Sequence, residues 1–114
     1  MGSNIPSAPV KSDRDLTEIL KSSDRMIALF YLSWCPFCAR FLPVFQKTAA
    51  AEAGRNWVFV QDDQEVMAER YAIAVYPTVL FFEKGAVSKR LDGVPGVGLD
   101  ERRLADFIKL CPPA

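Results

Sequence analysis

Histidine is absent from this chain of 114 residues, and cysteine occurs only three times, at Cys35, Cys38 and Cys111. Without histidine the chain can form neither a Cys–His nucleophilic pair nor a His-ligated zinc site. Three cysteines are too few for a disulfide framework, and a metal site built on them would need a carboxylate or a second subunit. With those sites excluded, the cysteine thiols are the main candidates for reactive groups, and we expect them to act without a bound metal.

The chain also lacks an excess of charge and a long apolar run. Lys plus Arg and Asp plus Glu number 14 each, and the charges are dispersed, so nothing attracts nucleic acid or an anionic membrane surface. The longest apolar stretch, residues 26–34, is too short to cross a bilayer, and no basic segment followed by an apolar stretch marks an export signal. We expect a monomer in the cytoplasm, although an exported form with its leader removed stays open.

Length and composition predict one domain, with half of the residues apolar. Residues 1–9, rich in Ser, Pro and Gly, are expected to form a flexible lead-in, and residues 10–114 a single domain whose first residue, Val10, begins a short edge strand. Four apolar or alternating segments predict strands at 25–32, 56–61, 78–83 and 86–91, the last two joined by a turn at Lys84-Gly85.

Helical spacing of apolar residues predicts four helices. The first follows the capping residue Ser12, the second runs over 35–53 and ends at Gly54, the third runs from Asp62 or Asp63 to residue 71, and the fourth follows Asp100. The third helix is expected to bury Val66, Met67 and Tyr71, and the fourth to bury Leu104, Phe107, Ile108 and Leu110. The order of elements indicates an α/β fold, a mixed sheet with helices on both faces.

The segment Trp34-Cys35-Pro36-Phe37-Cys38 lies where an apolar strand ends and a helical pattern begins. A cysteine at the start of a helix meets unpaired backbone N–H groups and the positive end of the helix dipole, which favour a thiolate. The second thiol, one turn later, is close enough to displace a partner and close an internal disulfide. The spacing therefore predicts thiol–disulfide exchange, with Cys35 as nucleophile and Cys38 as resolving thiol.

Beyond this motif, the chain resembles the thioredoxin family over roughly residues 10 to 110. Trp34 and the cysteine pair open the second helix, Pro43 stands five residues after Cys38, and a proline precedes a strand in Tyr76-Pro77-Thr78. A hairpin and the glycine of Asp92-Gly93 follow in the family's order. The resemblance implies the thioredoxin fold, a cis peptide bond before Pro77, and a Tyr76 backbone that pairs with an extended substrate. It also implies a substrate surface formed by Trp34, Pro36, Phe37, Tyr76, Pro77 and Gly93.

Two features depart from that family. Its reductases usually carry a buried Asp six residues before the first cysteine and a Lys on the adjacent strand, where this chain has Leu29 and Val58. Neither can titrate, so we expect weaker general-base assistance to Cys38. The dipeptide Pro36-Phe37 is more similar to glutaredoxins, but the paired glycines and acidic cap that hold glutathione have no clear match in residues 91–98.

The sequence thus predicts a thiol–disulfide oxidoreductase that acts on protein disulfides without a bound cofactor. By the resemblance, its redox partner would be a thioredoxin-reductase-like flavoenzyme. Three alternatives remain: a redox-inactive binding module with this fold, a glutaredoxin-like glutathione-dependent reductase, and a metal carrier using both cysteines. Cys111, far from the motif in sequence, is expected to be a free bystander thiol.

Overall fold

A four-stranded mixed sheet forms the centre of residues 8–113, the part of the chain that the computed structural model describes. The strands are β1 (Arg25–Tyr31), β2 (Trp57–Gln61), β3 (Thr78–Glu83) and β4 (Ala86–Leu91), and their order across the sheet is β2-β1-β3-β4. β1 runs parallel to β2 and antiparallel to β3, and β4 is antiparallel to β3. The edge strand expected at Val10 is a single parallel bridge to Val60. The predicted lead-in, residues 1–9, lies outside the described residues except for its last two.

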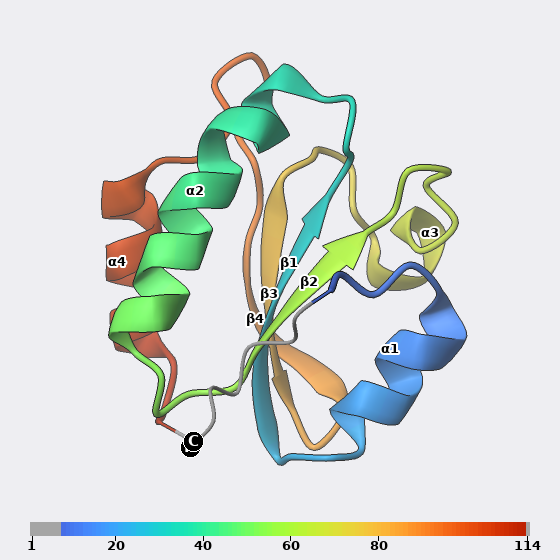
Figure 1. Ribbon diagram of the computed structural model, residues 1–114, viewed down its shortest axis with the longest axis vertical. Coiled ribbons are helices and arrows are strands. Elements are labelled where there is room, and N and C mark those ends of the chain that lie inside the picture. Colours follow the sequence, from blue (N-terminus) through green and yellow to red (C-terminus); the bar gives the residue numbers. More distant parts are fainter. Residues whose placement is uncertain (1–7, 114) are drawn as a thin grey trace.

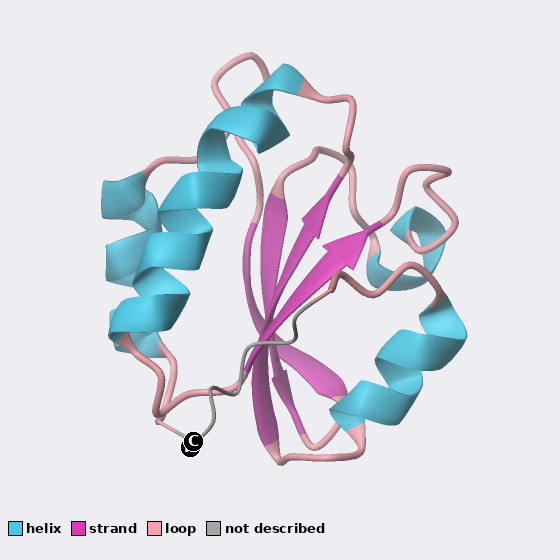
Figure 2. Ribbon diagram, viewed as in Figure 1, coloured by secondary structure: helices cyan, strands magenta, loops and turns pink. Residues whose placement is uncertain are grey.

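Helices cover both faces of this sheet, as Figures 1 and 2 show. The helices are α1 (Asp13–Leu20), α2 (Pro36–Ala51), α3 (Ala68–Tyr71) and α4 (Glu101–Leu110). α2 and α4 lie together on one face, and α1 and α3 lie on the other (Figure 1). The predicted fold class is confirmed.

Two helix starts and the hairpin follow directly from local sequence. The side chain of Ser12 accepts a hydrogen bond from Asp15 N at 3.1 Å, and that of Asp100 accepts one from Arg103 N at 2.9 Å. Both residues therefore cap their helices as predicted. Lys84 and Gly85 have φ values of 52° and 82°, the left-handed pair that a two-residue hairpin requires.

Aromatic side chains fill the core between β1, β2 and α2. The Phe45 ring on α2 is fully buried and lies edge-on to the rings of Trp57 and Phe59, each at a centroid distance of 5.4 Å. Six of the seven residues of β1 are buried, which explains the continuous apolar run in the sequence. β1 is thus a rigid support for the loop that follows it.

Three sequence predictions about helices were wrong. α2 ends at Ala51 with Glu52 as its cap, two residues before Gly54, because the Glu52 carbonyl accepts a hydrogen bond from the indole of buried Trp57. Val66 is 61% exposed, since the positive φ of Glu65 interrupts the helix, which begins only at Ala68. Leu110 is 66% exposed because the buried stripe of α4 continues from Leu104, Phe107 and Ile108 to Cys111 instead.

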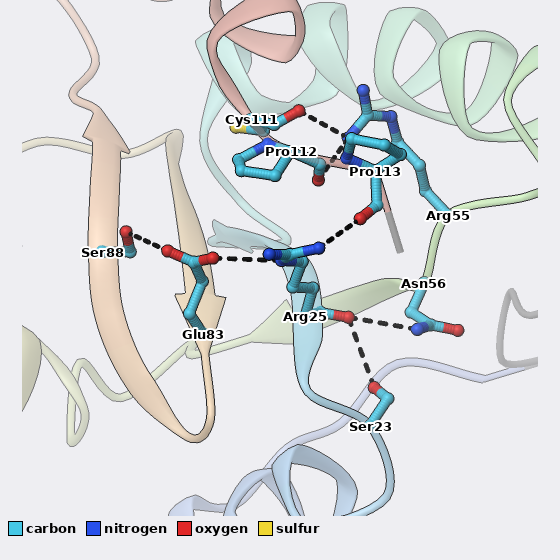
Figure 3. Close-up of polar contacts among 9 residues, drawn as sticks. All are labelled: Ser23, Arg25, Arg55, Asn56, Glu83, Ser88, Cys111, Pro112 and Pro113. Atoms are coloured by element: carbon cyan, nitrogen blue, oxygen red, sulfur yellow. Dashed lines mark hydrogen bonds and ion pairs between the residues drawn. The ribbon is translucent and has the colours of Figure 1, made fainter.

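Two arginines at the start of β1 and β2 hold the last residues of the described chain (Figure 3). Arg55 donates to the carbonyls of Cys111 at 3.0 Å and Pro112 at 3.1 Å, and Arg25 donates to Pro113 O at 2.7 Å. Arg25 also pairs with Glu83 at 3.0 Å. We call Arg25 and Arg55 the arginine clasp. Because β1 begins at Arg25 and ends before Cys35, the clasp and the cysteine pair lie at opposite ends of this strand.

Candidate active site

Cys35 occupies the N-cap position of α2, just beyond the end of β1. Its φ and ψ of −95° and 124° are extended, and its N–H closes a tight turn onto Leu32 O at 3.3 Å. Its carbonyl accepts the first helical bond, from Ala39 N at 2.9 Å, while Pro36 begins the helix. The side chain is half-buried, so a disulfide partner can reach a sulfur at the positive end of the helix dipole. The predicted strand-to-helix placement is confirmed.

Cys38 lies one turn further along α2 and is buried, with only 1% of its surface exposed. Its Sγ accepts a hydrogen bond from Leu32 N at 3.4 Å. Burial is the main cause that raises the pKa of the Cys38 thiol to about 12; the Leu32 N–H opposes the rise, and Cys35 and the charge of Asp63 add to it. The two cysteines therefore differ in burial, Cys35 being half-buried and Cys38 enclosed.

The Tyr76–Pro77 peptide bond is cis, as predicted. Within residues 8–113, the backbone N–H and C=O of Tyr76 take part in none of the turn, loop or cap hydrogen bonds, whereas its side chain is buried. Gly93 lies against this segment: a Cβ at position 93 would overlap the carbonyl oxygen of Pro77 and come within 3.1 Å of Val75 Cγ1. Gly93 N also donates to Thr78 Oγ1 at 3.3 Å. A glycine is therefore required where the two loops meet.

Trp34 and Phe37 flank the cysteines in different ways. Trp34 is 64% exposed, and its indole N–H is held at 3.5 Å from Asp63 O. Phe37 is half-buried under the guanidinium of Arg40, 5.2 Å from the ring centroid, and its side chain lies against Gly98. Pro36 is exposed between the two cysteines. Trp34 and Pro36 thus present apolar surface to solvent beside Cys35.

Leu29 and Val58 are both fully buried, on the adjacent strands β1 and β2. The positions where related reductases carry charged groups are therefore apolar packing positions here. The buried carboxylate near the site belongs instead to Asp62, which is 1% exposed. Sequence reasoning considered Asp62 and Asp63 only as helix caps and missed their contacts with Tyr76 and Ser33, described below. The pair of acidic residues directly after a buried strand was the available signal.

Cys111 is a buried thiol at the end of α4, with its Sγ 3.4 Å from Phe107 O. Burial is the main cause that raises its pKa to about 11. A buried and protonated thiol is a poor nucleophile, which fits the bystander role expected from the sequence. Among residues 8–113, no three Cys, Asp or Glu side chains come together as a metal-ligand group. No helix in that range is long and apolar enough to cross a membrane.

The site combines a Cys-x-x-Cys pair at the start of a helix with a cis proline directly before β3 of a mixed sheet, so the protein is an α/β protein with a paired-cysteine site. Residues 8–109 match the family model described as Thioredoxin, and the chain therefore belongs to the thioredoxin family. Thioredoxin from Mycolicibacterium smegmatis is 29% identical over 113 residues, which cover 95% of this chain and 100% of that protein. The reduced Schistosoma mansoni thioredoxin pre-protein has the same fold, with a TM-score of 0.75 at 23% identity over 93% of this chain and 100% of that one.

Protein disulfide-isomerase A5 from Mus musculus is 32% identical over 81 residues. The match covers 67% of this chain but only 16% of that much longer relative, so this chain corresponds to a small part of it. Together, the thioredoxin and disulfide-isomerase relatives support thiol–disulfide oxidoreductase activity as the general class.

Proposed function

We propose that this protein exchanges disulfides with protein substrates through Cys35 and Cys38. The observation that carries the proposal is the contrast between the two thiols: half-buried Cys35 begins α2, and enclosed Cys38 follows one turn later. An incoming disulfide can meet only the first sulfur. The second sulfur is protected from solution but lies on the same helix, where it can finish the exchange.

The reaction proceeds in two steps in the reducing direction. The Cys35 thiolate attacks one sulfur of the substrate disulfide, which forms a mixed disulfide and releases the other substrate sulfur as a thiolate. Cys38, after losing its proton, then attacks Cys35 Sγ; the Cys35–Cys38 disulfide forms and the second substrate thiolate leaves. Two electrons pass from the dithiol to the substrate. No bound cofactor takes part, because the cysteine pair itself is the redox group.

The substrate would lie across Trp34, Pro36 and the Tyr76–Pro77 segment. An extended chain can pair with the Tyr76 backbone, whose N–H and C=O make no turn or loop hydrogen bonds among the described residues. The exposed Trp34 ring offers apolar contact beside the attacked sulfur. Phe37 supports this surface through its contact with Gly98, and Gly93 supports it through its contact with the Pro77 backbone.

Reduction of insulin with dithiothreitol as electron donor tests the proposal. Cys35→Ser should abolish the catalysed rate, since no attacking sulfur remains. Cys38→Ser, incubated with insulin in the absence of dithiothreitol, should retain attack and accumulate a mixed disulfide, visible as a mass increase that added dithiothreitol reverses. Cys111→Ser is the matched control and should keep the wild-type rate, because that thiol is enclosed near the arginine clasp. Full turnover by the Cys35 variant would refute the assignment.

The physiological reductant would be a second protein, for which a thioredoxin-reductase-like flavoenzyme is the candidate. Replacing dithiothreitol by such an enzyme with NADPH, or by glutathione, distinguishes this donor from a glutaredoxin-like reaction. Turnover with glutathione alone, at a rate equal to that with the flavoenzyme, would contradict the flavoenzyme as the preferred donor.

A redox-inactive binding module is the second candidate, favoured by the apolar side chains at Leu29 and Val58. Without a charged group at either position, proton loss from Cys38 depends on water, substrate or a more distant carboxylate. A wild-type protein that binds a disulfide-containing partner but shows no disulfide reductase activity and forms no mixed disulfide would support this module over the oxidoreductase.

A further inference from the structure

Two consecutive aspartates directly after β2 contact the two loops that border Cys35. Successive residues of an extended chain point to opposite sides. In agreement, Asp62 is 1% exposed, whereas Asp63 is half-buried at the surface. The backbone N–H of Asp62 donates to Tyr31 O at 2.9 Å, so the pair is also anchored to the last residue of β1.

Asp62 holds the loop that contains the cis proline. Its Oδ2 accepts a hydrogen bond from the Tyr76 hydroxyl at 2.7 Å. Its carboxylate also accepts backbone N–H bonds from Val66 at 2.9 Å and Met67 at 3.1 Å. Burial, together with the bond to Asp62, raises the pKa of Tyr76, so the hydroxyl remains a donor at neutral pH. The backbone of Tyr76, which would pair with the substrate, is thus held in place through the side chain of the same residue.

Asp63 holds the loop that precedes Cys35. Its Oδ1 accepts Ser33 N at 2.6 Å, and its Oδ2 accepts the Ser33 hydroxyl and Gln61 Nε2, both at 2.7 Å. Its carbonyl accepts the Trp34 indole N–H. The bond from the Ser33 N–H is the main cause that lowers the pKa of Asp63, which therefore stays ionised in this contact. Ser33 and Trp34 are consequently attached to the end of β2.

We propose that Asp62 and Asp63 are positioning residues: by holding Tyr76 and Ser33-Trp34 on the end of β2, they fix the two walls between which a substrate would lie. The inference rests on the proposed function, since this positioning matters only if an extended protein substrate lies between Cys35 and Tyr76. Among the described residues, neither aspartate forms a hydrogen bond with Cys35 or Cys38, and each acts through the neighbour that it holds.

A small disulfide provides the test, because hydroxyethyl disulfide has no backbone that could pair with Tyr76. In Tyr76→Phe, we expect the ratio of kcat/KM for insulin to kcat/KM for hydroxyethyl disulfide to fall about three- to tenfold, the size of one lost hydrogen bond. Tyr71→Phe is the matched control: it removes the hydroxyl of another buried tyrosine from a Tyr–Asp contact, that between Tyr71 and Asp13, and should leave the ratio unchanged.

Coupling between the partners distinguishes positioning from a general loss of structure. If Tyr76 acts through Asp62, combining Tyr76→Phe with Asp62→Asn should lower the ratio of kcat/KM for insulin to kcat/KM for hydroxyethyl disulfide no further than whichever single substitution lowers it more. On the other wall, Asp63→Ala should likewise lower the ratio, whereas Asp63→Asn, which keeps an acceptor for Ser33 N, should recover most of that loss.

Hydrogen–deuterium exchange gives a readout that does not depend on activity. In Tyr76→Phe, amides of residues 73–76 should exchange at least about threefold faster, with no change in residues 13–20. An unchanged ratio and unchanged exchange would overturn the inference, as would an equal effect in Tyr71→Phe. If the wild type reduces neither substrate, the proposed function fails. Faster exchange at residues 73–76 in Tyr76→Phe would still show that the hydroxyl positions this wall.

Discussion

Resolution of the mixed disulfide by Cys38 should accelerate steeply with pH and should not level off below pH 9. The attacking species is the thiolate, and burial raises the pKa of Cys38 from 9.0 to about 12. With that pKa, roughly one molecule in 100,000 carries the Cys38 thiolate at pH 7. Each further pH unit multiplies this fraction about tenfold until the pKa is reached.

The pKa of Cys38 falls somewhat when Cys35 is bonded to substrate. Cys35 raises the pKa through a hydrogen bond and through its charge, and both effects are absent in the mixed disulfide. Burial, the largest cause, remains, and so does the Asp63 charge, while the Leu32 N–H continues to oppose them. Burial therefore keeps the pKa of Cys38 raised in the mixed disulfide, and the first-order rate of resolution should keep rising across the neutral range, by up to about tenfold for each pH unit.

Dithionitrobenzoate separates this step from the first attack. Cys35 releases one thionitrobenzoate at a rate proportional to reagent concentration, and Cys38 then releases a second in a concentration-independent phase. Stopped-flow absorbance measures both, and Cys38→Ser should show only the first. A plateau of the second phase below about pH 9 would mean that the enclosed thiol ionises no higher than an ordinary cysteine, which would refute the reasoning from burial.

Three further predictions concern stability and packing, each measured by chemical denaturation with the activity assay alongside. Phe45→Ala should lower the free energy of unfolding by about 3–5 kcal/mol, because a fully buried ring between Trp57 and Phe59 leaves a cavity; a loss below about 1 kcal/mol would contradict this packing. Gly93→Ala should cost about 1–3 kcal/mol and reduce insulin turnover, since its Cβ meets the Pro77 backbone; wild-type behaviour in both assays would show that the loops do not meet there. Arg55→Ala should cost about 1–3 kcal/mol through lost bonds to carbonyls near the end of α4, with unchanged redox activity, and equal stability would argue against the clasp.

The parts of the site that could be predicted are those in which a short sequence segment determines both the local backbone and the reactive group. The cysteine spacing, the proline at 77 and the apolar run before Cys35 place the nucleophile at a strand-to-helix junction, and the structure confirms that placement. The family resemblance added the cis bond. These features depend on local backbone preferences, which few neighbours can override.

The contacts that could not be predicted join residues far apart in sequence. The Tyr76 hydroxyl meets Asp62 across 14 positions, and Ser33 meets Asp63 across 30. Such pairs depend on where each strand ends, and an error of one residue would turn either aspartate to the other side. The exposure of Val66 escaped prediction for a related reason: it follows from the positive φ of Glu65, which a residue other than glycine rarely adopts.

The arginine clasp lies at the opposite end of β1 from the sulfurs, and seven strand residues separate the two regions by roughly 20 Å. Substitutions this far apart, with no shared contacts, contribute additively to stability. Heat resistance can therefore be engineered around Arg25 and Arg55 while the redox potential is tuned independently between Cys35 and Cys38. The contacts of the arginine clasp and the cysteine pair thus lie at opposite ends of β1.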